Sequence, residues 1–146
     1  MSEQLTTPVR PDANLGYLFR LAHQRFRAAL DDALRDLGLT TQDYVVLSVF
    51  ETRPELSSSE LARITQVTRQ TMHTAVLGLE SAGLLERTSR NQRVVLIRPT
   101  ARGRKILRTA TARVREVERA AFAGLSAGEE QAVRAWLAGV AGGAAS

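Results

Sequence analysis

Cysteine is absent from this 146-residue chain. Its absence excludes disulfides, thiolate zinc sites and any cysteine-based redox switch, and it agrees with a reducing compartment, so we expect a cytoplasmic protein. Long apolar runs are also missing, and none approaches the roughly 18 residues that a membrane span needs. The first eleven residues lack the charged start and apolar centre of a signal peptide, so we expect no export.

Signatures of catalysis are missing as well. The chain has two histidines, His23 and His73, and they fall in different segments. No Gly-rich phosphate loop, Gly-x-Ser-x-Gly elbow or His-Glu-x-x-His sequence occurs. We therefore predict a protein that is not an enzyme and that needs neither a metal nor a cofactor.

Basic residues are present in excess and are unevenly distributed. The net charge is +5, from 20 Lys and Arg against 15 Asp and Glu. Residues 1–56 carry −2, residues 57–105 carry +6 and residues 106–146 carry +1. A basic centre between near-neutral flanks is typical of a subregion that faces a polyanion. A solvated basic face explains the charge equally well, so charge alone does not decide the function.

Most of the chain has the apolar spacing of amphipathic helices. Ser or Thr in N-cap positions marks where helices begin, in several cases with Glu or Asp three residues later. The period changes only after Gly83, where two short strands surround a turn. The predicted elements are helices over 12–37 and 41–52, a short helix from Ser58, a helix between Thr68 and Gly83, strands over 84–88 and 93–98, a helix over 101–123 and a last helix after Ser126.

Two of these helices have the spacing of a helix-turn-helix. Only a few residues separate Ile64 from Thr68, which is the tight turn of that motif. The hairpin that follows has the position of a wing. We therefore predict a single, mainly α domain over 1–146 with a small β-hairpin, in which a winged helix-turn-helix over 57–98, hereafter the reading head, contacts DNA.

The order of these elements resembles the MarR family of bacterial transcription regulators over nearly the whole chain. Each motif is weak alone, but six in the right order are not expected by chance. They are Ser58-Ser59-Glu60-Leu61-Ala62, Val67-Thr68-Arg69-Gln70-Thr71, Leu79-Glu80-Ser81-Ala82-Gly83-Leu84-Leu85-Glu86-Arg87, Asn91-Gln92-Arg93, Thr100-Ala101-Arg102-Gly103 and Leu125-Ser126-Ala127-Gly128-Glu129-Glu130. The resemblance implies repression of transcription and, in many relatives, release by a small aromatic or anionic effector.

The candidate recognition helix follows Thr68. A helical wheel turns Met72, Val76 and Leu79 inward and leaves Gln70, His73, Thr74 and Leu77 on the opposite side. Side chains in the first two turns of such a helix reach base edges, where Gln suits adenine, Arg suits guanine and a Thr methyl suits thymine. Solvated polar residues at a helix start would have the same composition. The predicted DNA-binding residues are Ser58, Arg63, Thr68, Arg69, Gln70, Thr71, His73, Thr74, Arg90 and Arg93.

The wing carries four arginines in twelve residues, and alternation along a strand prevents all of them from facing DNA. Arg90 and Arg93 flank the turn, so we predict that they contact the minor groove or phosphates. The resemblance assigns Arg93 to the Arg of an Asp-x-Arg wing motif. Asn91 stands where the family has Asp, which calls into question an ion pair that would brace the wing. Thr74 stands where the family often has Arg, so we infer that affinity depends more on the wing and on Arg63 and Arg69.

A single short recognition helix gives little specificity, so we expect a homodimer on a pseudo-palindromic operator of roughly 16–20 base pairs. The helices over 12–37 and 101–140 have apolar stripes wide enough to form its interface. The resemblance places an effector between these helices and the reading head, with His23, Arg27 and Tyr44 as candidates. His23 as a boundary histidine and Tyr44 as a core aromatic are the structural alternatives. The competing function is a winged-helix module for nonspecific DNA packaging or protein contacts.

Overall fold

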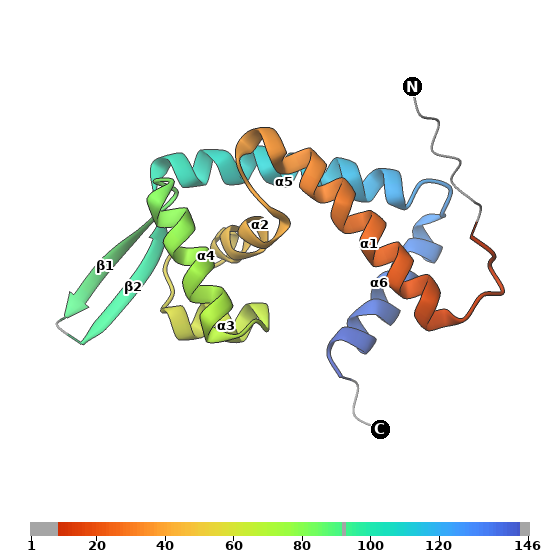
Figure 1. The fold of residues 1–146 in the computed structure, drawn as a ribbon, viewed down its shortest axis with the longest axis horizontal. Coiled ribbons are helices and arrows are strands. Elements are labelled where there is room, and N and C mark those ends of the chain that lie inside the picture. The colour runs from red at the N-terminus through yellow and green to blue at the C-terminus, as the bar shows by residue number, and fades with distance from the viewer. Residues whose placement is uncertain (1–8, 92, 144–146) are drawn as a thin grey trace.

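A computed structural model describes residues 9–91 and 93–143, without the side chain of Arg90. It is mainly helical with one antiparallel hairpin, which confirms the predicted fold class (Figure 1). The α-helices are α1 (Leu15–Leu34), α2 (Thr41–Ser48), α3 (Ser58–Thr65), α4 (Arg69–Ser81), α5 (Ala101–Ala121) and α6 (Ala127–Ala141). The strands are β1 (Leu85–Asn91) and β2 (Val94–Pro99), and the 3₁₀ turns are η1 (Arg35–Leu37) and η2 (Val49–Glu51).

Five helices begin where their capping residues predict. In each, the side-chain oxygen of a Ser or Thr accepts a hydrogen bond from the backbone amide three residues later. Three of these caps are complete capping boxes, in which the acidic residue at that third position also accepts from the cap's own amide. Such caps satisfy amides that the helix leaves unpaired. The capping residues are Thr40, Ser57, Thr68, Thr100 and Ser126.

Several predicted boundaries were wrong by a few residues. The first helix begins at Leu15 instead of residue 12, because the Asn14 side chain caps it. Both α1 and α2 tighten into 3₁₀ turns at their ends, so their α-helical parts are shorter than predicted. The first strand is longer than predicted, because cross-strand pairing continues past a bulge to Asn91 and Val94, and the second strand keeps its predicted length but lies one residue later.

The hydrophobic core lies under the reading head. All buried apolar residues of the described chain fall between Leu30 and Val114. They come from the end of α1, from α2, α3 and α4, from the strands, from α5 as far as Val114 and from the segments that connect these elements. Side chains with almost no exposed surface include Leu34, Leu47, Leu61, Met72 and Ile97. This packing fixes α3, α4 and the wing relative to one another.

The start of α5 crosses the junction between α4 and β1 at very close range. A Cβ atom on Gly103 would lie 2.0 Å from the carbonyl oxygen of Leu84, which is far inside van der Waals contact, so only glycine fits at this position. Thr100 ties the same crossing together, since its amide donates to Leu84 O at 3.0 Å and its hydroxyl donates to Gly83 O at 2.6 Å. The root of the wing is therefore held against α5.

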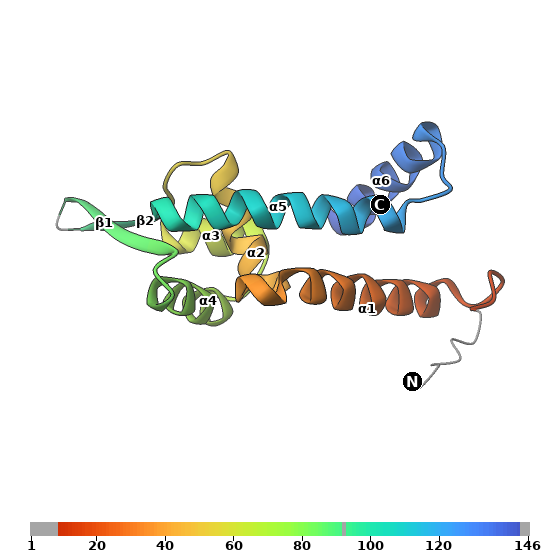
Figure 2. The same cartoon turned by 90° about the horizontal axis from the view of Figure 1, so that it is seen from above.

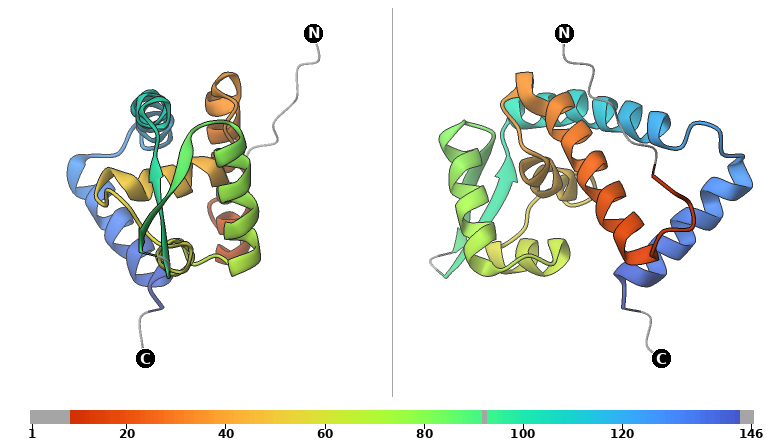
Figure 3. Two further views of the ribbon diagram at one scale, coloured as in Figure 1. Left: turned by 90° about the vertical axis from the view of Figure 1, so that its left-hand side faces the viewer. Right: turned by 45° about the vertical axis from the view of Figure 1, so that its right-hand side comes forward.

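A second region of the molecule has no buried residue among those described. We call residues 15–29 of α1, residues 115–121 of α5 and all of α6 the terminal arm. Here α6 folds back from the end of α5 toward α1 (Figure 3), and the rings of Phe19 and Trp136 lie 5.5 Å apart. Large apolar side chains remain exposed in this arm, including Leu15, Tyr17, Phe19, Trp136, Leu137 and Val140.

Candidate nucleic-acid interface

The turn between α3 and α4 has the geometry of a helix-turn-helix. Gln66 ends α3 in the left-handed conformation, with φ of 56°, and redirects the chain within two residues to the Thr68 cap of α4. Val67 packs against the core beside this turn. Two short helices are thereby held at a fixed angle with their outer faces open.

The outer face of α4 is the one that the helical wheel predicted. Met72, Val76 and Leu79 are buried, and the predicted base-contacting side chains are exposed on the other side. Thr68 and Thr71 lie at the start of the helix, where the Thr68 hydroxyl donates to that of Thr71 at 2.9 Å. The exposed residues of this face are Gln70, Thr71, His73, Thr74 and Leu77.

Two arginines border a shallow hollow beside the turn. Arg63 from α3 and Arg69 from α4 line a space of about 400 Å³ together with Ser59 and Val67. Neither arginine forms an ion pair with an acid of the described chain, although Glu60 also lines this hollow. The pKa of Glu60 is held below its ordinary value, because its carboxylate accepts hydrogen bonds from the amide and hydroxyl of Ser57. The charge of Arg63 also lowers the pKa of Glu60, to a smaller extent. The hollow therefore presents two guanidinium groups that form no ion pair within the described chain.

Ser58 is the first residue of α3 and is exposed beside its cap. Its position leaves it close to the backbone amides at the start of α3, and amides at a helix N-terminus can bind a phosphate.

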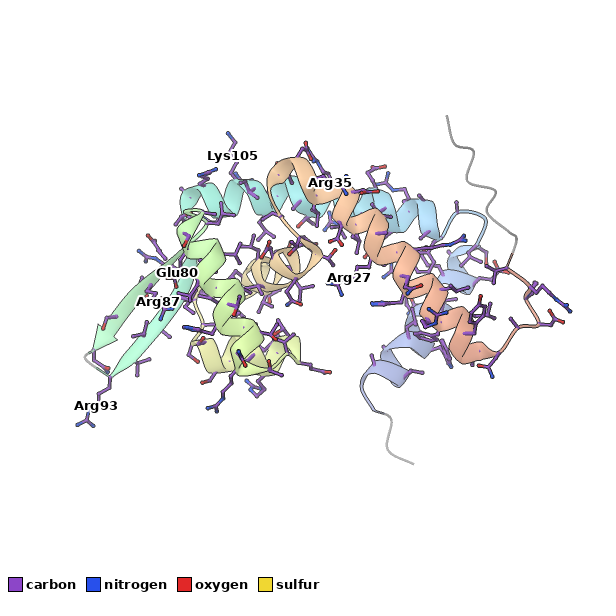
Figure 4. All side chains as sticks on the ribbon, viewed as in Figure 1. Arg27, Arg35, Glu80, Arg87, Arg93 and Lys105 are labelled. Atoms are coloured by element: carbon purple, nitrogen blue, oxygen red, sulfur yellow. The ribbon has the colours of Figure 1, made fainter. Side chains whose placement is uncertain are left out.

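The arginines of the wing fall into two kinds. Arg87 on β1 is paired with Glu80 on α4, with Nε and Oε1 2.7 Å apart (Figure 4), and Arg98 is paired across the strands with Glu86 at 2.8 Å. Arg93 lies in the turn and extends away from the tip with no acidic partner in the described chain. Arg90 lies in β1, but its side chain is outside the described residues. The two internal ion pairs were not foreseen from the sequence.

Asn91 closes the tip of the wing. Its side-chain oxygen accepts hydrogen bonds from the amides of Arg93 and Val94, both at 3.1 Å, and its carbonyl accepts one from the Ser89 hydroxyl at 2.6 Å. An Asp at this position could accept the same bonds but would add a negative charge beside Arg93. The wing is thus braced by Glu80 and by this turn, without the Asp that the family has at the position of Asn91.

These parts lie toward one side of the molecule. Figure 1 shows α3, the start of α4 and the tip of the hairpin along the lower edge, with α5 along the upper edge. Seen from above, α4 and α5 lie on opposite sides of the head, with α2 and α3 between them (Figure 2). A surface that bears Arg63, Arg69 and Arg93 around an exposed helix face has the charge and shape to meet nucleic acid.

The candidate effector residues come from two neighbouring helices. His23 and Arg27 are exposed on α1, and Tyr44 on α2 is half-buried against the core. Asp31 joins the two helices, because its carboxylate accepts hydrogen bonds from the amide and hydroxyl of Thr41 at 2.9 and 2.6 Å. Those bonds hold the pKa of Asp31 below its ordinary value. The effector role of the three residues stays a prediction.

No group of three or more His, Asp or Glu side chains in the described part of the chain could hold a metal ion. None of the described helices combines the length and apolar character that crossing a bilayer requires.

Comparison with known proteins identifies the family. Residues 37–93 match the family model described as MarR family. The HTH-type transcriptional repressor Rv2887 of Mycobacterium tuberculosis is 41% identical over 95 residues, which cover 64% of this chain and 68% of that protein. The chain belongs to the MarR family.

Solved MarR-family structures share the fold along most of the chain. The crystal structure of Rv2887 in complex with DNA has a TM-score of 0.72 and 36% identity, and the match covers 88% of this chain and 98% of that one. A probable transcriptional regulator from Pseudomonas aeruginosa has a TM-score of 0.80 at 28% identity, over 90% of this chain and 99% of its own. Rv2887 has also been solved with salicylic acid, with a TM-score of 0.69, 35% identity and coverage of 90% and 99%.

Proposed function

We propose that this protein is a sequence-specific DNA-binding transcriptional repressor that acts as a homodimer on a pseudo-palindromic operator. The observation that carries the proposal is the outer face of α4, which is exposed and polar at its start and is flanked by Arg63, Arg69 and Arg93 without acidic partners. The relative Rv2887, named a repressor and solved with DNA, supports the same function.

In this proposal the α4 side chains contact bases in the major groove and the wing contacts the adjoining minor groove. Ser58 and Arg63 from α3, with Thr68 and Arg69 at the start of α4, contact the phosphate backbone that borders the groove. Gln70, Thr71, His73 and Thr74 face the bases. Arg93, with Arg90 beside it in sequence, contacts the minor groove or its phosphates.

The terminal arm forms the dimer interface. Its exposed apolar side chains on α1 and α6 match the predicted dimerisation helices over 12–37 and 101–140. Six large exposed apolar side chains on two helices that touch through Phe19 and Trp136 favour an interaction surface over a solvated one. Two-fold symmetry then presents two recognition helices to two half-sites about one DNA turn apart.

A small aromatic or anionic effector releases the repressor. Rv2887 solved with salicylic acid, and a BpsR structure from Bordetella bronchiseptica whose regulation by 6-hydroxynicotinic acid is described, support this part of the proposal. In this chain His23 and Arg27 lie in the part of α1 that belongs to the terminal arm, and Tyr44 lies on the neighbouring helix α2. A response requires that the effector bind the two dimer conformations with different affinity.

The deciding experiment is selection of bound sequences from random DNA, carried out with the wild type and with Gln70→Ala. We expect an enriched inverted repeat that is bound at least about a thousandfold more tightly than random duplex at matched salt. Gln70→Ala should lose the preference at one position of each half-site. Equal affinity for selected and random duplex would contradict the proposal and favour the competing function, nonspecific DNA packaging.

A further inference from the structure

The outer face of α4 offers few free polar groups. The Thr74 hydroxyl donates to the Gln70 carbonyl at 3.1 Å, and the Thr71 hydroxyl accepts from that of Thr68. A hydroxyl bonded to its own helix has less capacity to bind a base edge. Its methyl group is then the part of Thr74 that can contact DNA.

Leu77 continues this apolar character along the helix. It lies three residues after Thr74 on the same face and 43% of its surface is exposed. The next residue is Gly78, which has no side chain to cover the leucine. A single exposed leucine is ordinary on a protein surface. This one lies on the same exposed face of α4 as Gln70 and Thr74, and Arg63 and Arg69 border the start of that helix.

We propose that Thr74 and Leu77 read the 5-methyl groups of thymines in the major groove, next to an adenine bound by Gln70. This inference rests on the proposed function and defines its specificity. Thymine alone presents a methyl group in the major groove, and apolar side chains recognise it by excluding water from it. Cytosine and guanine would place unpaired polar edges against the same side chains.

The spacing along α4 fits neighbouring base pairs. Thr74 and Leu77 are separated by a rise of about 4.5 Å along the helix axis. Successive bases of one strand are separated by roughly 3.4 Å. The two side chains therefore meet methyl groups that are one or two steps apart, on one strand or on both. Each half-site should contain a short A·T segment that is read from the major groove.

The test uses deoxyuridine, which pairs as thymine does but lacks the methyl group. In the operator recovered by selection, each thymine is replaced in turn by deoxyuridine in both half-sites, and affinity is measured by fluorescence anisotropy at fixed salt. Removal of a contacted methyl should lower affinity about fourfold, because a buried methylene-sized group contributes that much. Two positions in each half-site should respond. The wing cannot produce this effect, since the methyl group is not displayed in the minor groove.

Two variants assign the response to residues. Leu77→Ala should bind the thymine and deoxyuridine operators equally at one of the two positions. Thr74→Ser keeps the hydroxyl and removes the methyl, so it should lose the response at the other position. Gln70→Ala is the matched control from the same face: it should bind more weakly overall and keep both responses.

Equal binding of all deoxyuridine operators by the wild type would overturn the inference. So would a Leu77→Ala and a Thr74→Ser protein that both keep the full wild-type response. Either result leaves the proposed function intact, because the operator is still bound specifically. A selection that enriches no sequence would instead contradict the proposed function and this inference together.

Discussion

The head of the molecule and its terminal arm treat apolar side chains in opposite ways. All buried apolar side chains of the described chain lie between Leu30 and Val114 and form one core, whereas the described part of the arm buries none. Trp136 and Val140 on α6 are 47% and 54% exposed, yet the helix is well formed and begins with a complete capping box. A region can thus have regular secondary structure without tertiary burial. The difference agrees with the proposal that the arm packs against a second copy of the chain.

The largest expected effect is a loss of stability in the head, at the crossing of α5 over the root of the wing. Gly103→Ala should destabilise the protein by about 3 kcal/mol, because the new methyl overlaps the Leu84 carbonyl and neither backbone can move freely. Urea unfolding measures this loss. The matched control is Gly139→Ala in α6, where nothing lies within 4 Å and the exchange should be neutral or stabilising. Equal stability of the two variants would mean that the crossing is looser than the structure indicates.

The next largest effect should appear in the arm. Trp136→Ala should weaken dimerisation by about 2 kcal/mol, since large aromatic side chains dominate interface energies. Sedimentation as a function of concentration measures the dissociation constant. The control is Gln131→Ala, an exposed residue of the same helix, which should have little effect. A wild-type protein that sediments as a monomer and still binds the operator with full affinity would contradict the role of the arm in dimerisation.

Within the reading head, the arginines of the wing allow a smaller test, because Arg93 has no acidic partner in the described chain and Arg98 has one. Arg93→Ala should weaken operator binding about tenfold and reduce the salt slope by about 0.9 for each phosphate contact that is lost. Arg98→Ala is the control, because Arg98 is already paired with Glu86 and has little charge to offer DNA. Titrations at several salt concentrations give both quantities. An unchanged slope for Arg93→Ala would place that side chain away from DNA.

The smallest effect concerns the contact between α1 and α2. The pKa of Asp31 is lowered in the folded state by hydrogen bonds from Thr41, so its contribution to stability is present above the unfolded pKa of about 3.9. That contribution is lost as the pH falls through the lower, folded pKa. Asp31→Asn should cost less than about 1 kcal/mol at neutral pH, because an amide oxygen still accepts from Thr41. Thermal unfolding of both proteins between pH 7 and pH 3 should show their difference shrinking in acid, and a constant difference would contradict this.

The sequence was most informative where structure depends on neighbouring residues. Caps such as Ser57 and Thr100 bond to amides three residues away, so the starts of five helices could be read directly. The inward stripe of α4 likewise follows from helical periodicity, and with it the exposed face that carries Gln70 and Thr74. These interactions join residues that are only three or four positions apart, so the sequence allows few other pairings.

Through-space pairing was harder to foresee. Arg87 and Arg98 are indistinguishable in composition from Arg93, and only the folded hairpin shows that acids engage two of the three. The fold brings Glu80 on α4 beside Arg87 on β1, seven residues away, across the turn at Gly83. Strand length was also misjudged, because the pairing that extends to Asn91 depends on the partner strand. The functional roles of the α4 and α1 side chains stay predictions.

Helix α5 belongs to both regions, and this has a mechanical consequence. It is a continuous helix from Ala101 to Ala121, in which buried residues of the core extend as far as Val114 and residues 115–121 lie in the arm. Its 21 residues give a lever of about 30 Å. A tilt of about 5° at the arm would move the clamped end by roughly 2.5 Å, close to the spacing of successive bases along one strand. A small rearrangement between two copies could therefore shift a recognition helix out of register with its half-site.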